Sequence, residues 1–237
     1  MNYLKMFIED CKYYDPRGIE IKTIVKYVEL KGKIILDVGT GIGRLAFPLS
    51  KYAKKVIVLD KNKIFNGYFK RHKRENIEFI NKKVEDYLKK DEKFDIILLA
   101  WPNFNLKFLD IIKKVMNKKN LLIFITCDNN SDFETIMKKI GPISRNYIKK
   151  DIGNKKMFMN ILSKKFKVII KKKINTEYIY PNTKIAFRII KNGLKLWFNI
   201  KLNKTNQEKL IELINKHKAG NKIKFGEIIH FYILKIK

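Results

Sequence analysis

The sequence predicts an α/β protein with a three-layer, doubly wound and mostly parallel sheet. Short apolar runs recur along the first half of the chain, and each is followed by a segment whose apolar residues have helical spacing. A chain that alternates strands and helices in this way forms a parallel sheet with helices on both faces. The apolar runs are residues 33–38, 56–59, 77–80, 94–100 and 121–126.

Helical segments precede and separate these strands. Two helices are expected ahead of the first strand, over residues 1–14 and 18–30, because Asp15-Pro16 disfavours a continuous helix. The second should bury Ile21, Ile24, Val25 and Val28. Ser131 should cap a later helix, with Glu134 completing a capping box. The crossover helices are expected to begin near residue 42 and to cover residues 61–74, 106–117 and 131–139.

The stretch of residues 33–60 carries the clearest signal of a binding site. It reads as strand, glycine loop, helix and strand, with Gly39, Gly41 and Gly43 in the loop. Glycine lets the backbone turn sharply and approach a ligand, because no Cβ stands in the way. Asp60 ends the second strand, where a carboxylate can accept hydrogen bonds from ribose hydroxyls. The stretch therefore predicts a nucleotide-type site at the carboxyl edge of the sheet.

The spacing of the glycines distinguishes between ligands. The dinucleotide fingerprint G-x-G-x-x-G/A needs a small third residue, and counting from Gly39 that position is Arg44. The sequence instead gives D-x-G-x-G-x-G, beginning at Asp37. With Asp60 downstream, this loop resembles motif I and the following acidic strand end of the class I S-adenosylmethionine (SAM) dependent methyltransferases. The alternative is a plain β-α-β turn with coincidental glycines.

The resemblance implies a methyltransferase whose cofactor is SAM. In this family the glycine loop passes along the methionine and ribose of SAM, and the second acid binds the ribose. No catalytic residue is assigned, because SAM supplies the leaving group and the protein mainly positions the acceptor. The residues assigned to the cofactor are Asp37, Gly39, Thr40, Gly41, Gly43, Asp60, Lys61, Val84, Glu85, Ala100 and Trp101.

Two further segments resemble the family less closely. Residues 81–87 resemble the segment that packs against adenine, but Lys83 stands where many members have an acid. That acid is missing here or has moved to Glu85 or Asp86, so adenine recognition is expected to rest on a backbone amide and Val84. At the tip of the fourth strand, residues 101–104 (WPNF) share only the proline and an aromatic residue with the N/D/S-P-P-Y/F/W tip of amino-methylating enzymes.

The family fold also predicts how the chain ends. Class I sheets have seven strands, and strand 7 is antiparallel, so the last two strands are expected at residues 166–174 and 228–236. Between them we expect helices over 183–191 and 205–216 and a strand-like run at 197–198. The predicted organisation is N-terminal helices over the cofactor pocket (1–30), a methyltransferase core (31–174 and 226–237) and a basic cap (175–225) inserted between strands 6 and 7.

The net charge bears on the methyl acceptor. The chain has 53 basic and 23 acidic residues, a net charge of +30, which favours a polyanionic partner such as RNA. Residues 151–237 carry 21 basic and 5 acidic residues, so the surplus is densest in the part that should hold the cap. The basic cluster at 70–74 could contact phosphates, and the aromatic residues Tyr178, Tyr180, Trp197 and Phe198 could stack on bases.

Two other functions remain as alternatives to RNA methylation. If coding bias explains the abundant lysines, the acceptor is a small molecule or a protein, held in a closed pocket under the cap. A non-catalytic, SAM-binding regulator is the third possibility. The sequence leaves the oligomeric state open.

Other sequence features suggest a soluble protein without a metal site. The two cysteines do not form a disulfide framework, so a reduced, cytoplasmic setting is expected. No apolar run reaches the roughly 18 residues of a membrane span, and residues 1–14 lack the apolar segment of a signal peptide. His217 and His230 show neither metal-ligand spacing nor a paired acid.

Overall fold

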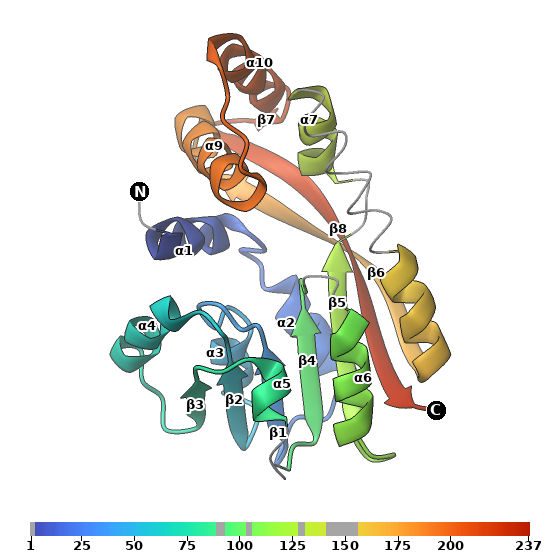
Figure 1. The fold of residues 1–237 in the computed structure, drawn as a ribbon. Helices are drawn as coiled ribbons and strands as arrows, with labels where there is room; N and C mark the ends of the chain where they lie inside the picture. The colour runs from blue at the N-terminus through green and yellow to red at the C-terminus, as the bar shows by residue number, and fades with distance from the viewer. Residues whose placement is uncertain (1–2, 89–92, 103–105, 128–130, 141–155) are drawn as a thin grey trace. The chain divides into compact units, whose positions relative to one another are not determined.

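The computed structural model describes residues 3–88, 93–102, 106–127, 131–140 and 156–237 (Figure 1). The chain divides into two compact units. We call them the sheet unit, which comprises Glu20–Thr126, Lys155–Lys173 and His230–Lys237, and the helical unit, which comprises Met1–Ile19, Cys127–Asn154 and Ile174–Ile229. The two longest strands, β6 (Phe166–Tyr180) and β8 (Lys222–Ile236), contribute residues to both units.

The sheet has the doubly wound order that the sequence predicts. Its strands follow the order β3-β2-β1-β4-β5-β8-β6. Strands β1 to β5 pair in parallel, and β8 runs in the opposite direction (Figure 1). The order changes direction between β1 and β4, and ligands of such folds bind at this switch point, beyond the carboxyl ends of the strands. The parallel strands are β1 (Ile34–Val38), β2 (Lys55–Leu59), β3 (Ile77–Ile80), β4 (Ile96–Ala100) and β5 (Leu121–Cys127).

The end of the sheet differs in detail from the prediction. Strands β6 and β8 have 15 residues each, longer than expected, because both continue from one unit into the other. A further two-residue strand, β7 (Lys218–Ala219), pairs antiparallel with the start of β8. The tight turn between β7 and β8 contains Gly220, whose φ of +61° suits glycine.

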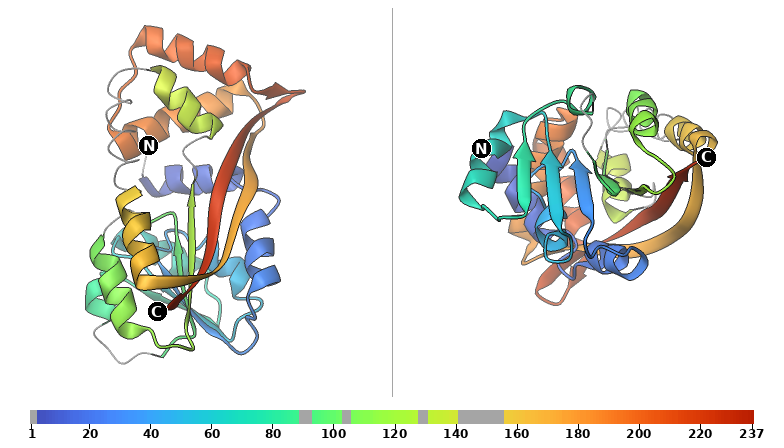
Figure 2. Two further views of the ribbon diagram at one scale, coloured as in Figure 1. Left: turned by 90° about the vertical axis from the view of Figure 1, so that its right-hand side faces the viewer. Right: turned by 90° about the horizontal axis from the view of Figure 1, so that it is seen from below.

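Helices cover both faces of the sheet unit. On one face, α5 (Val84–Tyr87), α6 (Leu106–Val115) and a helix at 156–165 enclose a core with the strands, whereas α2 (Ile19–Tyr27) lies on the other face (Figure 2). The central strands are buried on both faces, as their continuous apolar runs require. Leu36 and Ile97 point into the core beneath α5 and α6. Ile35, next to Leu36 in β1, points to the opposite face and is also fully buried.

Two crossover helices are shorter than the sequence suggests. The helix expected to begin near Ile42 is reduced to α3 (Ala46–Leu49), because Pro48 has no N–H to donate to the preceding turn. The segment 61–74 forms a 3-10 turn (η1, Lys63–Phe65) followed by α4 (Asn66–Arg71). The side chain of Asn62 accepts a hydrogen bond from Ile64 N and so starts the turn later than expected.

The helical unit has a core of its own. It contains α1 (Tyr3–Tyr13), α7 (Asp132–Ile140), α9 (Thr183–Phe198) and α10 (Lys204–Asn215). Buried apolar residues of α7, α9 and α10 pack together, among them Ile136, Ile189 and Leu210. Glu134 N donates to Ser131 Oγ at 3.1 Å, which confirms the predicted N-cap of α7.

One predicted element of the helical unit is wrong. The strand-like run at 197–198 is the end of α9, which stops at Asn199 in a left-handed conformation with φ +52°. The buried residues Ala186, Ile190 and Leu194 continue one helical face, so the apolar residues at the end extend that pattern rather than begin a strand.

Candidate functional site

The loops after β1, β2 and β4 leave the same edge of the sheet. Gly39 N donates to Leu59 O at 2.8 Å, and Asp60 N donates to Ile80 O at 3.2 Å. Trp101 N donates to Ile125 O at 2.9 Å in the same way. These bonds continue the parallel pairing past the strand ends, so the predicted cofactor residues lie on adjacent loops at the switch point.

The three loop glycines all have a left-handed backbone, but the space around them differs. Their φ angles are +74° at Gly39, +58° at Gly41 and +73° at Gly43. A Cβ at Gly39 would meet no atom within 4 Å, so the backbone there borders open space. A Cβ at Gly43 would come within 3.0 Å of Phe47 and Phe69. Gly39 therefore suits close approach by a ligand, whereas Gly43 allows the loop to pack on the sheet unit.

The Asp60 carboxylate holds the glycine loop and retains capacity to bind. Its Oδ2 accepts from Gly41 N at 3.0 Å, and its Oδ1 accepts from Asn62 N at 2.8 Å. The Asn81 amide donates to Asp60 O at 2.8 Å, which fixes the backbone from the loop after β3. Each carboxylate oxygen has two lone pairs, so Asp60 can accept further hydrogen bonds from a pair of hydroxyls.

Asp37 is a buried carboxyl at the end of β1. It is 4% exposed, and its Oδ2 accepts from Thr40 Oγ1 at 2.7 Å. The pKa of Asp37 is raised from 3.8 to about 6. Burial is the main cause, and the Asp60 carboxylate adds to it, while the Thr40 hydroxyl and the Arg44 guanidinium act in the opposite direction. Asp37 therefore changes charge close to neutral pH.

The remaining predicted residues lie around this edge. Lys61 is exposed next to Asp60, and Ala100 is the half-buried last residue of β4. Val84 is 5% exposed at the start of α5, and Glu85 is half-buried beside it. The last two residues of the WPNF tip, 103 and 104, lie outside the described part of the chain.

Sequence reasoning missed one residue that the structure brings to the site, Glu20. It lies in α2 with no exposed surface, and its carboxylate forms an ion pair with Arg44. Its Oε1 also accepts from Trp101 Nε1 at 2.9 Å. Glu20 therefore connects the end of the glycine loop with the tip of β4.

The predicted inner face of the second helix is right in part. Ile24 and Val28 are buried as expected, whereas Val25 is 37% exposed and the polar residues Glu20 and Thr23 are buried. The prediction considered only apolar residues, so it did not include Glu20 in the buried face. The positions of Glu20, Ile24 and Val28, four residues apart, were the signal that could have revealed it.

The expected base-stacking role does not fit Tyr180, and Tyr178 is partly buried beside it. Tyr180 is 2% exposed, and its ring packs against Tyr13 at a centroid distance of 5.3 Å. Tyr178 packs against Tyr14 at 4.8 Å, and burial raises the pKa of both Tyr178 and Tyr180. Tyr180 belongs to the core of the helical unit, and Tyr178 packs against that core. The side chains of residues 197 and 198 lie outside those the structure describes.

The described part of the chain corrects one prediction about histidine and also bears on metal and membrane binding. His217 does have a paired acid, because its Nδ1 lies 3.5 Å from Asp132 Oδ2. The two residues are far apart in the sequence, so spacing could not show the pair. No cluster of three or more metal-ligating side chains occurs among the described residues. None of the described helices is both long and apolar enough to cross a membrane.

Comparisons with known proteins agree with this site. A family model described as a methyltransferase domain matches residues 35–118, which include the glycine loop, Asp60 and β4. A search of curated proteins finds no significant match.

Several solved structures share the fold. A SAM-dependent methyltransferase from Thiobacillus denitrificans, in complex with S-adenosyl-L-homocysteine (SAH), is 13% identical with a TM-score of 0.53, over 92% of this chain and 91% of that one. A Bacillus halodurans protein provisionally described as a methyltransferase is 17% identical with a TM-score of 0.57, over 92% and 99%. The YcgJ protein of Bacillus subtilis is 16% identical with a TM-score of 0.56, over 93% and 98%.

The strand order and the glycine loop at the switch point define a Rossmann-like fold of the methyltransferase type. The methyltransferase-domain model over residues 35–118 and the shared fold of the solved structures are consistent with the class I SAM-dependent methyltransferase predicted from sequence. SAM is the cofactor of this family. The open space at Gly39 and the accepting lone pairs of Asp60 fit a cofactor that carries a ribose.

Proposed function

We propose that SAM binds along the loop from Gly39 to Gly43, with the ribose hydroxyls on Asp60. Thr40 and Asp37 then lie beside the methionine part, and Val84 and Glu85 lie beside the adenine. Support comes from the left-handed glycines, the open space at Gly39 and the buried Val84. Lys61, Ala100 and Trp101 complete the proposed set of cofactor residues.

The chemistry follows from this arrangement. Bound SAM supplies a sulfonium methyl group and its own leaving group. The protein has to exclude water and align the acceptor. Trp101, at the tip of β4 beside the glycine loop, is suited to the alignment because its indole is held by Glu20.

We propose that the acceptor is RNA. The observation that supports this most directly is a set of exposed lysines beside the proposed cofactor site, which we call the lysine rim. Two of its members follow β2 and two follow β3, at the carboxyl edge of the sheet where Asp60 and Val84 also lie. A row of lysines there would attract the phosphates of an RNA whose target base enters the site. The rim consists of Lys61, Lys63, Lys82 and Lys83.

The acceptor class can be tested by labelling. The purified protein is incubated with tritiated SAM and, separately, with RNA, protein and metabolite fractions of the source cell. We expect label in the RNA fraction. Label confined to metabolites or to protein would instead support the coding-bias alternative and would contradict the RNA proposal.

A charge reversal tests the lysine rim itself. Lys63→Glu with Lys82→Glu should weaken RNA binding roughly tenfold or more and lower the slope of log K against log salt by about 2, one per lost phosphate contact. The matched control is Lys118→Glu with Lys119→Glu. These two exposed lysines lie just before β5, at the opposite edge of the sheet, and give the same change in net charge.

The comparison of the two pairs decides the outcome. RNA binding is measured by fluorescence anisotropy at several salt concentrations, and SAH binding by calorimetry reports whether the cofactor site is intact. Equal losses of RNA affinity in the two double variants would mean that binding follows net charge rather than the rim. Wild-type RNA affinity in the rim variant would reject the proposed docking surface.

A further inference from the structure

The Glu20 carboxylate is a buried charge that interacts with Arg44 and Trp101, which lie on different segments. Glu20 has no exposed surface, while the Arg44 side chain is 21% exposed. Burying an ionised carboxylate is unfavourable unless it is paired and hydrogen-bonded. Arg44 and Trp101 are two of the partners through which Glu20 meets this condition. Its two oxygens serve different partners, Oε2 for Arg44 and Oε1 for the indole N–H of Trp101.

Trp101 is held in an unusual conformation. Its φ is +53°, a left-handed value that is uncommon for a bulky residue and costs conformational energy. The backbone N–H of Trp101 is fixed by Ile125 O at 2.9 Å, and its indole N–H is fixed by Glu20 at 2.9 Å. A residue in a strained conformation persists where its surroundings determine it, and such residues gather at functional sites.

Arg44 connects this carboxylate to the cofactor loop. It directly follows Gly43, where a Cβ would lie only 3.0 Å from ring atoms of Phe47 and Phe69. A displacement of Arg44 would therefore move the loop, and a displacement of the loop would alter the pairing of Glu20. The same carboxylate would transmit that change to Trp101 at the tip of β4.

We propose that Glu20 is a positioning residue that couples the glycine loop to Trp101. Cofactor binding to the loop and the orientation of the Trp101 indole then depend on each other through this one carboxylate. The inference rests on the proposed placement of SAM along the loop and is independent of the nature of the acceptor. A purely structural role for Glu20 would affect folding without linking the two.

The test uses the full-length protein with Trp197→Phe, so that Trp101 is the sole fluorescent tryptophan. Glu20→Gln keeps an oxygen for the indole but removes the charge that pairs with Arg44. Glu20→Leu removes both interactions. Trp101→Phe retains an aromatic ring but removes the indole N–H, together with some of the ring volume. Glu29→Gln is the matched control, because Glu29 is an exposed acid just beyond α2.

Calorimetry is done on every variant, and fluorescence is measured on those that retain Trp101. SAH affinity is measured by calorimetry, and the emission maximum and acrylamide quenching of Trp101 are measured with and without SAH. We expect Glu20→Leu to weaken SAH binding roughly tenfold to a hundredfold, as the loss of hydrogen bonds to a charged group suggests. Trp101 should become more accessible to acrylamide. Glu20→Gln should fall between Glu20→Leu and wild type, and Glu29→Gln should match wild type.

A double-variant cycle separates coupling from independent effects. In calorimetry, which does not need the fluorophore, Glu20→Leu combined with Trp101→Phe should weaken SAH binding no more than the stronger single variant does. Additive losses would overturn the proposal, as would wild-type SAH affinity or unchanged Trp101 quenching in the Glu20 variants. If Glu20→Leu does not fold, the isosteric Glu20→Gln replaces it in the cycle with Trp101→Phe, and the same comparison of SAH affinities applies. None of these measurements uses RNA, so they are separate from the test of the acceptor.

Discussion

The two compact units differ strongly in charge. The sheet unit has 34 basic and 12 acidic residues, a net charge of +22, whereas the helical unit has 19 and 11, a net charge of +8. A coding bias towards lysine would act on both units alike. The surplus instead accompanies the unit that contains the glycine loop, which favours a polyanionic ligand for that unit.

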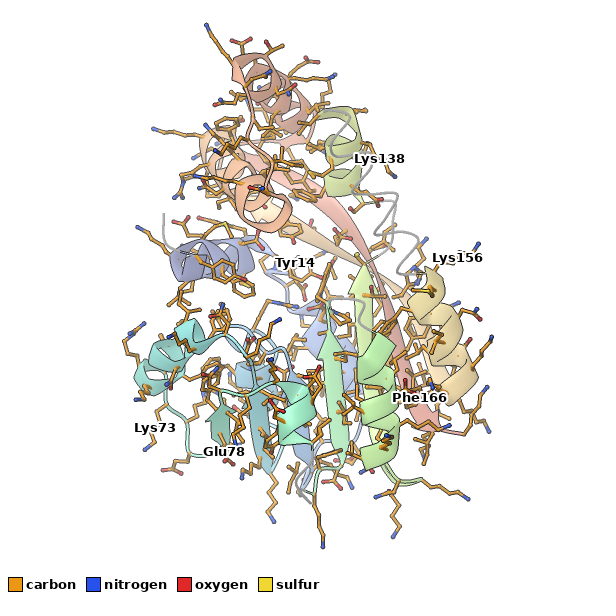
Figure 3. The ribbon with its side chains drawn as sticks, in the orientation of Figure 1. Tyr14, Lys73, Glu78, Lys138, Lys156 and Phe166 are labelled. Carbon is orange, nitrogen blue, oxygen red and sulfur yellow. The ribbon has the colours of Figure 1, made fainter. Side chains whose placement is uncertain are left out.

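The comparison also changes where the C-terminal surplus lies. Residues 155–173 contain eight lysines and no acidic residue, and they belong to the sheet unit. They account for half of the net +16 of residues 151–237, which the sequence seemed to place in the cap. Exposed lysines of the sheet unit include Lys73 and Lys156 (Figure 3). An acceptor-binding role for the predicted cap, residues 175–225, remains a prediction.

Both units bury acidic residues, but in different places. Asp37 and Glu20 of the sheet unit are buried around the glycine loop, whereas Asp15 and Glu227 are buried in the helical unit. The helical unit also has more exposed ion pairs, Glu9 with Arg188 and Glu177 with Arg17. Changes at Asp37 and Glu20 should therefore affect ligand binding and stability, and changes at these ion pairs should affect only local stability.

The largest effect is expected at Gly43. In Gly43→Ala the new Cβ would combine a left-handed backbone with contacts of 3.0 Å to two phenylalanine rings. The expected loss of stability is roughly 2–5 kcal/mol, from the backbone penalty together with overpacking. The measurement is denaturant unfolding followed by far-UV circular dichroism.

Gly39→Ala is the matched comparison for Gly43→Ala. It has the same backbone penalty but no neighbour within 4 Å, so it should cost only about 1–2 kcal/mol. Because its methyl group points into the proposed cofactor space, it should weaken SAH binding more than its loss of stability suggests. Equal stability losses in the two variants would contradict the different roles assigned to these glycines.

A pH-dependent effect is expected at Asp37. Its pKa is higher in the folded protein, about 6, than the ordinary 3.8, so the folded state binds the proton more tightly. Its contribution to stability is therefore greatest below about pH 4 and is lost as pH rises towards 6. The difference in pKa corresponds to about 3 kcal/mol at most.

The Asp37→Asn variant reveals this contribution, since asparagine does not titrate. The free energy of unfolding of Asp37→Asn minus that of wild type should become more positive between pH 4 and pH 7 and stay constant above. Urea unfolding at a series of pH values measures the difference. A constant difference over the whole range would show that Asp37 has an ordinary pKa.

The sequence predicts the sheet unit well because local patterns determine it. Continuous apolar runs identify β1 to β5, and the glycine loop with Asp60 identifies the switch point, since these features depend on neighbouring residues. The shortened α3 follows from Pro48, whose effect on the helix is local. These signals need no knowledge of distant contacts.

The features that the sequence did not predict depend on residues far apart in the chain. Glu20 meets Trp101 across 81 positions, and Asp132 meets His217 across a similar separation. The burial of Tyr180 follows from its packing on Tyr13 of the first helix. Composition identifies such residues as polar or aromatic, but only the folded chain determines whether they bind a ligand or one another.

The smallest effect is expected in the helical unit, at the ion pair of Arg188 with Glu9. Arg188 Nη1 lies 2.9 Å from both carboxylate oxygens of Glu9, and the Arg188 side chain is 42% exposed. Solvent weakens an ion pair this exposed, so Arg188→Ala should cost about 1 kcal/mol or less, and less at high salt. Arg188→Lys keeps the charge and should recover part of the loss.

The same variants measure how separate the two units are. Because Arg188 and Glu9 both belong to the helical unit, Arg188→Ala should leave SAH affinity at the wild-type value, in contrast to Glu20→Leu. Calorimetry with SAH at low and high salt makes this comparison. A loss of SAH affinity that matches the loss of stability would show that cofactor binding also depends on the helical unit, and the division of roles between the units would then be wrong.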